Sequence, residues 1–171
     1  MIKILFVCYG NICRSPMAEF VMKDLVNKRG LNDKFYIDSK ATDRANEIAK
    51  LGIYSETKKI LIENNIPFNE HISSQIRKED YEKFDYIIGM EEENIKNILK
   101  IVGEDYKNKI FKLLDFTNNP RDIVDPWYYG NFDLTYKDIK YGCEQFLDKI
   151  LYHFPKLSER IVLIAYQNLH S

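Results

Sequence analysis

The sequence predicts an α/β fold in which a parallel sheet of about four strands is covered by helices on both faces. Two observations predict it: short apolar runs rich in β-branched residues alternate with amphipathic helical segments, and 171 residues suffice for one core. Strands joined through helices form crossover units, which place the strands parallel to one another. We therefore expect one domain over residues 1–171, doubly wound in the flavodoxin-like manner.

The chain opens with a predicted strand, a tight loop and a helix. Residues 2–7 are apolar with one exception, as expected of a strand buried on both faces of a parallel sheet. Gly10 and Asn11 follow, and both residue types tolerate a positive φ. Ser15, followed by proline, indicates a helix N-cap, and Gly30 is placed to end that helix.

The later elements continue the alternation. Apolar runs predict further strands at residues 35–37, 86–88 and 110–114. Helical periodicity predicts helices at residues 55–65, 91–102 and 135–152. We expect a polar loop over residues 38–52 and an irregular stretch over residues 115–132.

Residues 156–171 form the last predicted element. Their apolar side chains recur at helical spacing, which predicts a C-terminal helical appendage docked on the body of the protein. The residues of this apolar face are Leu157, Ile161, Ile164, Ala165 and Leu169.

Composition restricts the partners and the compartment. The chain holds 25 Lys and Arg against 26 Asp and Glu, so neither nucleic acid nor a membrane surface is an expected partner. No apolar run reaches the roughly 18 residues that span a bilayer, and no signal peptide opens the chain. The odd set of three cysteines, Cys8, Cys13 and Cys143, therefore predicts reduced thiols in the cytoplasm.

The loop after the first strand carries the strongest chemical signal. Cys8 and Arg14 are separated by five residues, between the carboxyl end of a strand and a helix N-terminus, where α/β folds bind anions. Loop amides turned inward form a nest for a phosphate, and a guanidinium can grip two of its oxygens. The predicted phosphate-binding residues are Tyr9, Gly10, Asn11, Ile12, Cys13, Arg14 and Ser15.

The positive environment of this loop favours the thiolate form of Cys8, and a thiolate at the base of a phosphate cradle is a nucleophile toward phosphorus. A role for Cys8 as a small core residue is disfavoured because Arg14 beside it would be an unpaired charge. Ser15 either donates its hydroxyl to the sulfur or caps the helix. Cys13 is either a core residue or forms a protective disulfide with Cys8 under oxidation.

Residues 8–16 closely resemble the N-terminal signature of the low-molecular-weight protein tyrosine phosphatase family, with Tyr9 where an aliphatic residue or Thr is more common. Further similar stretches are Asp38-Ser39, His71 with residues 78–81, and residues 84–90, so the likeness covers about the first 150 residues. The resemblance implies hydrolysis of phosphotyrosine in proteins through a cysteinyl-phosphate intermediate. We expect a reaction without metal or cofactor, and a monomer or weak homodimer.

A departing phenol needs a proton donor opposite the nucleophile, and the candidate is Asp125. The proline after it restricts Asp125 to an extended conformation, so the carboxyl group projects from a rigid turn. The next residues, Trp127, Tyr128 and Tyr129, offer a wall for the substrate ring, although Trp127 could instead anchor the core. Members of the family carry the general acid in such an Asp-Pro-aromatic motif, which implies the same role for Asp125.

The resemblance also implies that Ser39 and His71 hold the strained Asn11 in the loop. The alternative for His71 is a surface histidine, because Ser73-Ser74-Gln75 replaces the usual Ala-Arg-Gln that follows. Residues 42–54 correspond to the variable specificity loop of the family, but they lack its common Trp and Asp-Pro-Arg.

Four other functions fit the sequence less well. Arsenate reduction requires resolving cysteines, and none lies between Cys13 and Cys143. Protein arginine phosphatases carry Thr where Ile12 stands, and the bulkier Ile12 fills space that a guanidinium would need. A cysteine phosphocarrier or a binding domain would need neither Arg14 nor Asp125. The prediction is therefore a phosphotyrosine phosphatase with Cys8 as nucleophile.

Overall fold

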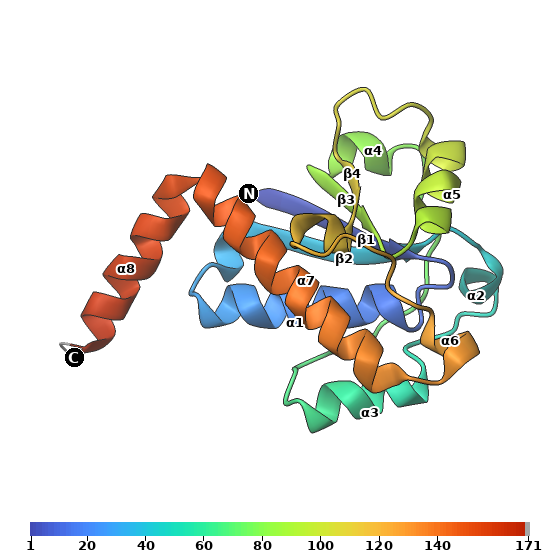
Figure 1. Ribbon diagram of the computed structural model, residues 1–171, viewed down its shortest axis with the longest axis horizontal. Helices are drawn as coiled ribbons and strands as arrows, with labels where there is room; N and C mark the ends of the chain where they lie inside the picture. The colour runs from blue at the N-terminus through green and yellow to red at the C-terminus, as the bar shows by residue number, and fades with distance from the viewer. Residues whose placement is uncertain (170–171) are drawn as a thin grey trace.

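The computed structural model describes residues 1–169, which form a parallel sheet between two layers of helices (Figure 1). The strands are β1 (Ile2–Cys8), β2 (Phe35–Ala41), β3 (Tyr86–Gly89) and β4 (Ile110–Lys112). Their order is β2-β1-β3-β4, and every neighbouring pair is parallel. The chain therefore winds from central β1 first to β2 and then across to β3, and the predicted doubly wound α/β fold is confirmed.

Helices cover both faces of the sheet. They are α1 (Arg14–Lys28), α2 (Ala45–Ile48), α3 (Ser55–Glu63), α4 (Asp80–Lys83), α5 (Glu92–Val102), α6 (Pro126–Tyr129), α7 (Phe132–His153) and α8 (Pro155–Leu169). Alternate residues of β1 serve the two sides: Ile4 and Phe6 join the core under α1, α3 and α7, whereas Leu5 and Val7 join the core under α4 and α5. Within residues 1–169, no helix combines the length and apolar character needed to cross a membrane.

The segment after α1 differs from the prediction in two ways. Strand β2 continues beyond residue 37 to Ala41, because the backbone of its polar half pairs with β1, with Ser39 opposite Phe6. Polar side chains hide such an extension from a search for apolar runs. The predicted polar loop also contains the short helix α2, and the short helix α4 precedes β3 without having been predicted.

The elements before α7 also differ in their bounds. Strand β4 ends at Lys112 instead of residue 114, because the Asp115 carboxylate accepts a hydrogen bond from the Lys112 amide at 2.9 Å and closes a 3₁₀ turn over Leu113–Phe116. The stretch predicted to be irregular contains α6. Helix α7 begins at Phe132, before the predicted residue 135, since the Asn131 side chain accepts a hydrogen bond from the Leu134 amide at 3.0 Å.

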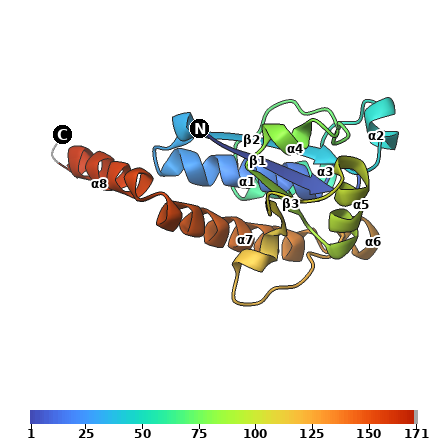
Figure 2. The same ribbon diagram turned by 90° about the horizontal axis from the view of Figure 1, so that it is seen from above.

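Helix α8 is present, but the prediction that its whole apolar face docks is wrong. Leu157 and Ile161 pack against the core, and Ile164 lies over Gly30, which ends α1 with a positive φ of 66°. Beyond this contact α8 leaves the body, as Figures 1 and 2 show. An ion pair of 2.9 Å between Arg160 and Asp33 fastens the near part of α8 to the loop before β2.

The far half of α8 is therefore mostly exposed. Ala165 and Leu169, predicted to face the body, are both exposed because the helix axis diverges from α1. Val162, Leu163 and Tyr166 are exposed on the same half. Residues 170 and 171 of the predicted appendage lie outside the described residues.

Gly142 lets α7 approach the turn that follows β4. A Cβ atom at this position would lie 2.6 Å from the Leu113 Cγ, and Leu113 is fully buried. We expect Gly142→Ala to lower the free energy of unfolding by about 1–2 kcal/mol, because overpacking outweighs the better helix propensity of Ala. Urea unfolding measures this change, and Lys140→Ala on the exposed face of α7 is the control. A Gly142→Ala variant as stable as the parent would contradict the close packing.

Candidate active site

The loop between β1 and α1 lies at the carboxyl ends of the strands, where the chain reverses its winding direction. Figure 1 shows α2, α5 and α6 gathered at this end of the sheet. Cys8, the last residue of β1, is 3% exposed. Its Sγ accepts a hydrogen bond from the Asn11 amide at 3.2 Å and lies 3.0 Å from the Ser15 Oγ. Two hydrogen-bond donors are thus positioned at the sulfur.

Ser15 does not cap α1, which corrects one of the two alternatives for this residue. The helix begins one residue earlier, at Arg14, and the N-cap position is held by Cys13 without a side-chain cap bond. The Ser15 hydroxyl instead lies between Cys8 Sγ and the Lys40 carbonyl oxygen, which is 3.3 Å away. Its single proton goes to one acceptor at a time, and a thiolate is the stronger of the two.

Asn11 shapes the loop. It is fully buried, has a φ of 55° in the left-handed region, and uses both ends of its side-chain amide. The Nδ2 group donates to the hydroxyls of Ser15 at 2.9 Å and Ser39 at 3.0 Å, and the Oδ1 atom accepts from the Ser74 amide at 3.1 Å. These bonds hold a backbone conformation that most residue types avoid.

Groups outside the loop bind the backbone carbonyls of the loop. Gly10 O accepts hydrogen bonds from Asn46 Nδ2 and Ser73 Oγ, both at 2.9 Å, and Ile12 O accepts one from the Tyr54 amide at 2.9 Å. Because these carbonyls point away from Cys8, the backbone amides of the loop face the sulfur. This is the arrangement that an anion-binding nest requires.

His71 and Ser39 both reach Asn11, and both lie near one buried carboxylate, which accepts a hydrogen bond from Ser39. His71 Nε2 lies 2.9 Å from the Asn11 carbonyl oxygen, which can only accept, so this nitrogen carries the proton. The His71 Nδ1 atom lies 4.0 Å from Glu19 Oε2, and Ser39 Oγ donates to the same oxygen at 2.5 Å. The predicted supporting residues are therefore assembled around the loop, together with Glu19, which the sequence analysis did not single out.

Arg14 is 1% exposed, and the two terminal nitrogens of its guanidinium have three partners. Nη1 donates to the Ile123 carbonyl at 3.0 Å, and both terminal nitrogens contact Glu91 at 3.0–3.1 Å. Nη2 also contacts Asp125 Oδ2 at 2.9 Å. Within residues 1–169 the buried Nε atom has no hydrogen-bond partner. Burial acts to lower the pKa of Arg14, but the hydrogen bond to Glu91 and the charges of Cys8 and Asp125 outweigh it and raise the pKa.

Asp125 lies at the start of α6 and connects it to Arg14. Its Oδ1 atom accepts a hydrogen bond from the Trp127 amide at 3.1 Å and caps the helix, with Pro126 in the first turn. The Oδ2 atom makes the 2.9 Å contact with Arg14, and the side chain is 15% exposed. The sequence motif thus places a carboxylate beside the arginine of the phosphate loop.

One cavity of about 350 Å³ joins these groups. Its floor holds Cys8 and Arg14, and its walls include Ile12, Leu51 and Asp125. Trp127 and Tyr128 complete the rim, whereas Tyr129 is exposed and does not line the cavity. The full set of lining residues is Cys8, Tyr9, Gly10, Ile12, Cys13, Arg14, Asn46, Leu51, Asp125, Trp127 and Tyr128.

Trp127 is 56% exposed, so the alternative of a core anchor is wrong for it. Its ring instead packs edge-on against Tyr54, with 5.0 Å between centroids, and Tyr54 stacks on Phe132 at 5.8 Å. Tyr54 also donates its amide to the phosphate loop. The aromatic wall is therefore fixed relative to Cys8 by packing rather than left on a free loop.

The other two thiols differ from Cys8 in their surroundings. Burial, followed by the charge of Cys8, raises the pKa of Cys13 to about 12, so Cys13 stays protonated near neutral pH. Burial also raises the pKa of Cys143, which lies in the core between α7 and α1. All three cysteines are free in the structure.

Comparison with known proteins gives consistent results. The profile of the family described as low molecular weight phosphotyrosine protein phosphatase matches residues 3–155. The low molecular weight protein-tyrosine-phosphatase YfkJ of Bacillus subtilis is 40% identical over 159 residues, which cover 88% of this chain and 96% of that protein. The crystal structure of YfkJ superimposes with a TM-score of 0.84 over 90% of this chain and 96% of that chain, at 39% identity.

Two further crystal structures are similar. The low molecular weight protein tyrosine phosphatase SP-PTP of Streptococcus pyogenes is 38% identical, with a TM-score of 0.77 over 87% of this chain and 93% of that chain. A Drosophila protein described as an arginine phosphatase is 32% identical, with a TM-score of 0.76 over 87% of this chain and 98% of that chain. The fold is thus shared by phosphatases that differ in the phosphorylated residue they are named for.

Proposed function

The chain belongs to the low molecular weight protein-tyrosine-phosphatase family and is a phosphoric monoester hydrolase, and we propose that Cys8, Arg14 and Asp125 perform its hydrolysis of phosphotyrosine in proteins. The observation that carries the proposal is the arrangement in one cavity. Cys8 Sγ lies beneath an amide nest, beside a buried arginine whose Nε lacks a partner among residues 1–169. A phosphate dianion would satisfy that orphaned donor, which is otherwise costly to bury.

In the first half of the reaction the Cys8 thiolate attacks phosphorus. The bond from sulfur to phosphorus forms as the bond from phosphorus to the phenolic oxygen breaks, and Asp125 gives its proton to that oxygen. The Asn11 amide and the Ser15 hydroxyl, which lie 3.2 and 3.0 Å from Sγ, stabilise the thiolate before attack and after its release.

In the second half a water molecule attacks the phosphorus of the cysteinyl-phosphate. Asp125 now accepts a proton from that water, the bond from phosphorus to sulfur breaks, and phosphate leaves with the Cys8 thiolate restored. Arg14 and the loop amides hold the equatorial oxygens in both transition states. Glu91 and the Ile123 carbonyl, which contact Arg14 at 3.0–3.1 Å, orient its guanidinium for this task.

The cavity above Cys8 fits a phenyl ring. Ile12 and Leu51 present aliphatic side chains, and Trp127 with Tyr128 presents aromatic surface. The apolar Ile12 offers no hydrogen bond to a guanidinium, which favours phosphotyrosine over phosphoarginine. Turnover of matched phosphotyrosine, phosphoarginine and phosphoserine peptides tests this preference. We expect kcat/KM to be highest for phosphotyrosine, and a higher value for phosphoarginine would contradict the assignment of the substrate.

The compartment and the assembly are part of the proposal. The reaction needs Cys8 in its reduced form, which the cytoplasm maintains, and we place the enzyme there. The three proposed catalytic groups line one cavity within a single chain, which supports a monomer or weak homodimer.

Asp125→Asn is expected to lower kcat/KM for phenyl phosphate by about 10²–10⁴-fold, because a positioned general acid contributes that much to the first step. The amide can still accept the hydrogen bond from the Trp127 backbone, so α6 keeps its cap. With nitrophenyl phosphate the loss of kcat/KM should be smaller, since kcat/KM reports on the first step alone and a good leaving group needs little protonation. A series of aryl phosphates with different leaving groups measures this dependence.

The control for this series is Asp122→Asn. Asp122 is half exposed and binds the Glu92 amide and Lys112 Nζ at 3.1 and 3.0 Å, away from Arg14. This variant should keep rates within a few-fold of the parent. An equal loss of kcat/KM for good and poor leaving groups in Asp125→Asn would show that Asp125 only holds the loop.

A further inference from the structure

A second hollow lies at the opposite end of the sheet from Cys8. Its volume is about 770 Å³, whereas the catalytic cavity measures about 350 Å³. The amino-terminal ends of the strands form one wall, through Ile2 and Tyr86, and the corner between α7 and α8 forms the other, through Phe154 and Leu157. The profile match to the phosphatase family ends at residue 155, so part of this second wall lies beyond it.

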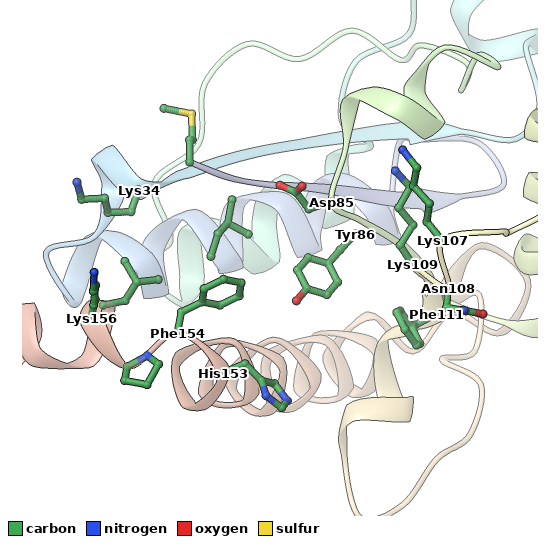
Figure 3. Close-up of a pocket in the computed structure, with 14 residues that line it drawn as sticks. Lys34, Asp85, Tyr86, Lys107, Asn108, Lys109, Phe111, His153, Phe154 and Lys156 are labelled. Atoms are coloured by element: carbon green, nitrogen blue, oxygen red, sulfur yellow. The ribbon is translucent and has the colours of Figure 1, made fainter.

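The interior of the hollow is largely apolar and aromatic. Figure 3 shows the rings of Tyr86 and Phe154 facing one another across the middle, with Phe111 toward one end. Tyr86 is anchored by an edge-on contact of 5.2 Å with Phe146, whereas Phe154 is 45% exposed. A half-exposed Phe that faces a preformed hollow is an apolar surface available to a ligand.

Lysines surround this apolar interior. Lys34 and Lys156 stand at one end in Figure 3, and Lys107 and Lys109 stand at the other. The acidic residue among the lining side chains is Asp85, whose carboxylate already accepts the Lys3 amide at 2.7 Å. The charge of the lining is therefore positive.

The lysines at the two ends are not equivalent. Lys107 Nζ pairs with Glu82 at 2.5 Å, and Lys109 Nζ donates to the Phe84 carbonyl at 2.7 Å. Lys34 is 3.7 Å from Asp33, but Asp33 has its closer partner in Arg160 at 2.9 Å. Lys156 has neither an ion pair nor a hydrogen bond within residues 1–169. Among the lysines of the lining, Lys34 and Lys156 are thus the two whose charges are available to a ligand.

We propose that this hollow binds a small aromatic anion. The aromatic body would lie between Tyr86 and Phe154, and the anionic group would pair with Lys34 and Lys156. The site shares no residue with the catalytic cavity, so the proposal goes beyond the phosphatase reaction. Because its walls come from the sheet and from the start of α8, a bound ligand would fasten α8 to the body.

The probe for this site is 8-anilinonaphthalene-1-sulfonate, titrated against the full chain with excess orthovanadate present to occupy the catalytic cavity. We expect saturable fluorescence enhancement with one site per chain. Lys156→Glu should weaken binding by about fivefold, since it removes one ion pair and adds a repulsion. Phe154→Ala should weaken it by about tenfold or more through lost ring contact. N-phenyl-1-naphthylamine, which has the same rings without the sulfonate, should bind more weakly than the sulfonate.

The matched control is Lys140→Glu, which makes the same charge change on the exposed face of α7. Unchanged hydrolysis of nitrophenyl phosphate shows that each variant is folded and that the catalytic site is intact. The proposal is overturned if the sulfonate does not bind, or if it binds only when vanadate is absent. It is also overturned if Lys140→Glu weakens binding as much as Lys156→Glu, or if the neutral probe binds as well as the sulfonate.

Discussion

Cys8→Ser is expected to reduce the hydrolysis of aryl phosphates by about 10⁴-fold or more, because removal of the proposed nucleophile blocks formation of the covalent intermediate. A serine hydroxyl is close in size to the thiol but does not ionise near neutral pH, and no base lies next to it in the loop. The Asn11 amide and Arg14 remain in place in this variant. The dissociation constant of phosphate or vanadate, measured by equilibrium binding to this variant, should therefore stay within a few-fold of the parent value.

Cys13→Ala provides the comparison for Cys8→Ser. Cys13 lies in the same loop and lines the same cavity, but its raised pKa keeps it a neutral thiol near pH 7. Its removal should leave kcat within a few-fold of the parent. Substantial turnover by Cys8→Ser, or an equal loss in the Cys13 variant, would mean that the attacking group is not Cys8.

Arg14→Lys should lower kcat/KM by about 10²–10⁴-fold, although the positive charge is kept. The guanidinium contacts Ile123 O, Glu91 and Asp125 with its terminal nitrogens, while Nε has no partner in the described part of the chain. A single ammonium group cannot hold these partners and also grip two phosphate oxygens. The loss should fall on kcat as well as KM, because the equatorial oxygens need this grip most in the transition state.

The control for this substitution is Arg29→Lys. Arg29 pairs with Asp148 at 2.8 Å on the surface, where either cation serves, so activity should not change. A near-parental kcat/KM for Arg14→Lys would show that Arg14 acts only as an electrostatic attractor. Circular dichroism of the lysine variant distinguishes a loss of activity caused by the missing phosphate contact from one caused by misfolding.

The parts of the site that sequence could predict are local. Cys8, Arg14 and Ser15 lie within one loop, and the strand before it and the helix after it fix where that loop sits in any doubly wound sheet. Asp125 could be recognised because proline and three aromatics follow it. Each of these residues can be recognised from its neighbours in the sequence. Its place in the fold follows from the parallel sheet that the alternating apolar segments predict.

The residues that sequence reasoning missed act through long-range contacts. Glu91 reaches Arg14 across 77 positions of the chain, and Glu19 reaches Ser39 across 20. A single carboxylate on a helix ordinarily indicates a solvated face, so neither stood out. Glu91 carries a weak signal in retrospect, since it follows closely after β3 at the edge of the sheet where ligands bind.

The bounds of β2 and the path of α8 show a second limit. The polar half of β2 is held by backbone pairing with β1, which side-chain patterns do not reveal. The apolar spacing in α8 predicted a helix correctly, but the same spacing cannot tell whether a face meets the body or projects from it. Those outcomes depend on the angle at which the chain leaves α7, which is a property of the assembled fold.

The most direct test of the account is the identity of the residue that carries the phosphoryl group. Asp125→Asn, mixed rapidly with nitrophenyl phosphate and quenched in denaturant, should accumulate phosphoenzyme, because the first step needs little acid whereas the second lacks its base. Mass spectrometry of the digest should place one phosphoryl group on the peptide that contains Cys8, and the same mixture with Cys8→Ser should show none. A phosphoryl group on another residue, such as His71 or Ser15, or full burst kinetics without any phosphoenzyme, would contradict the assignment of Cys8 as nucleophile.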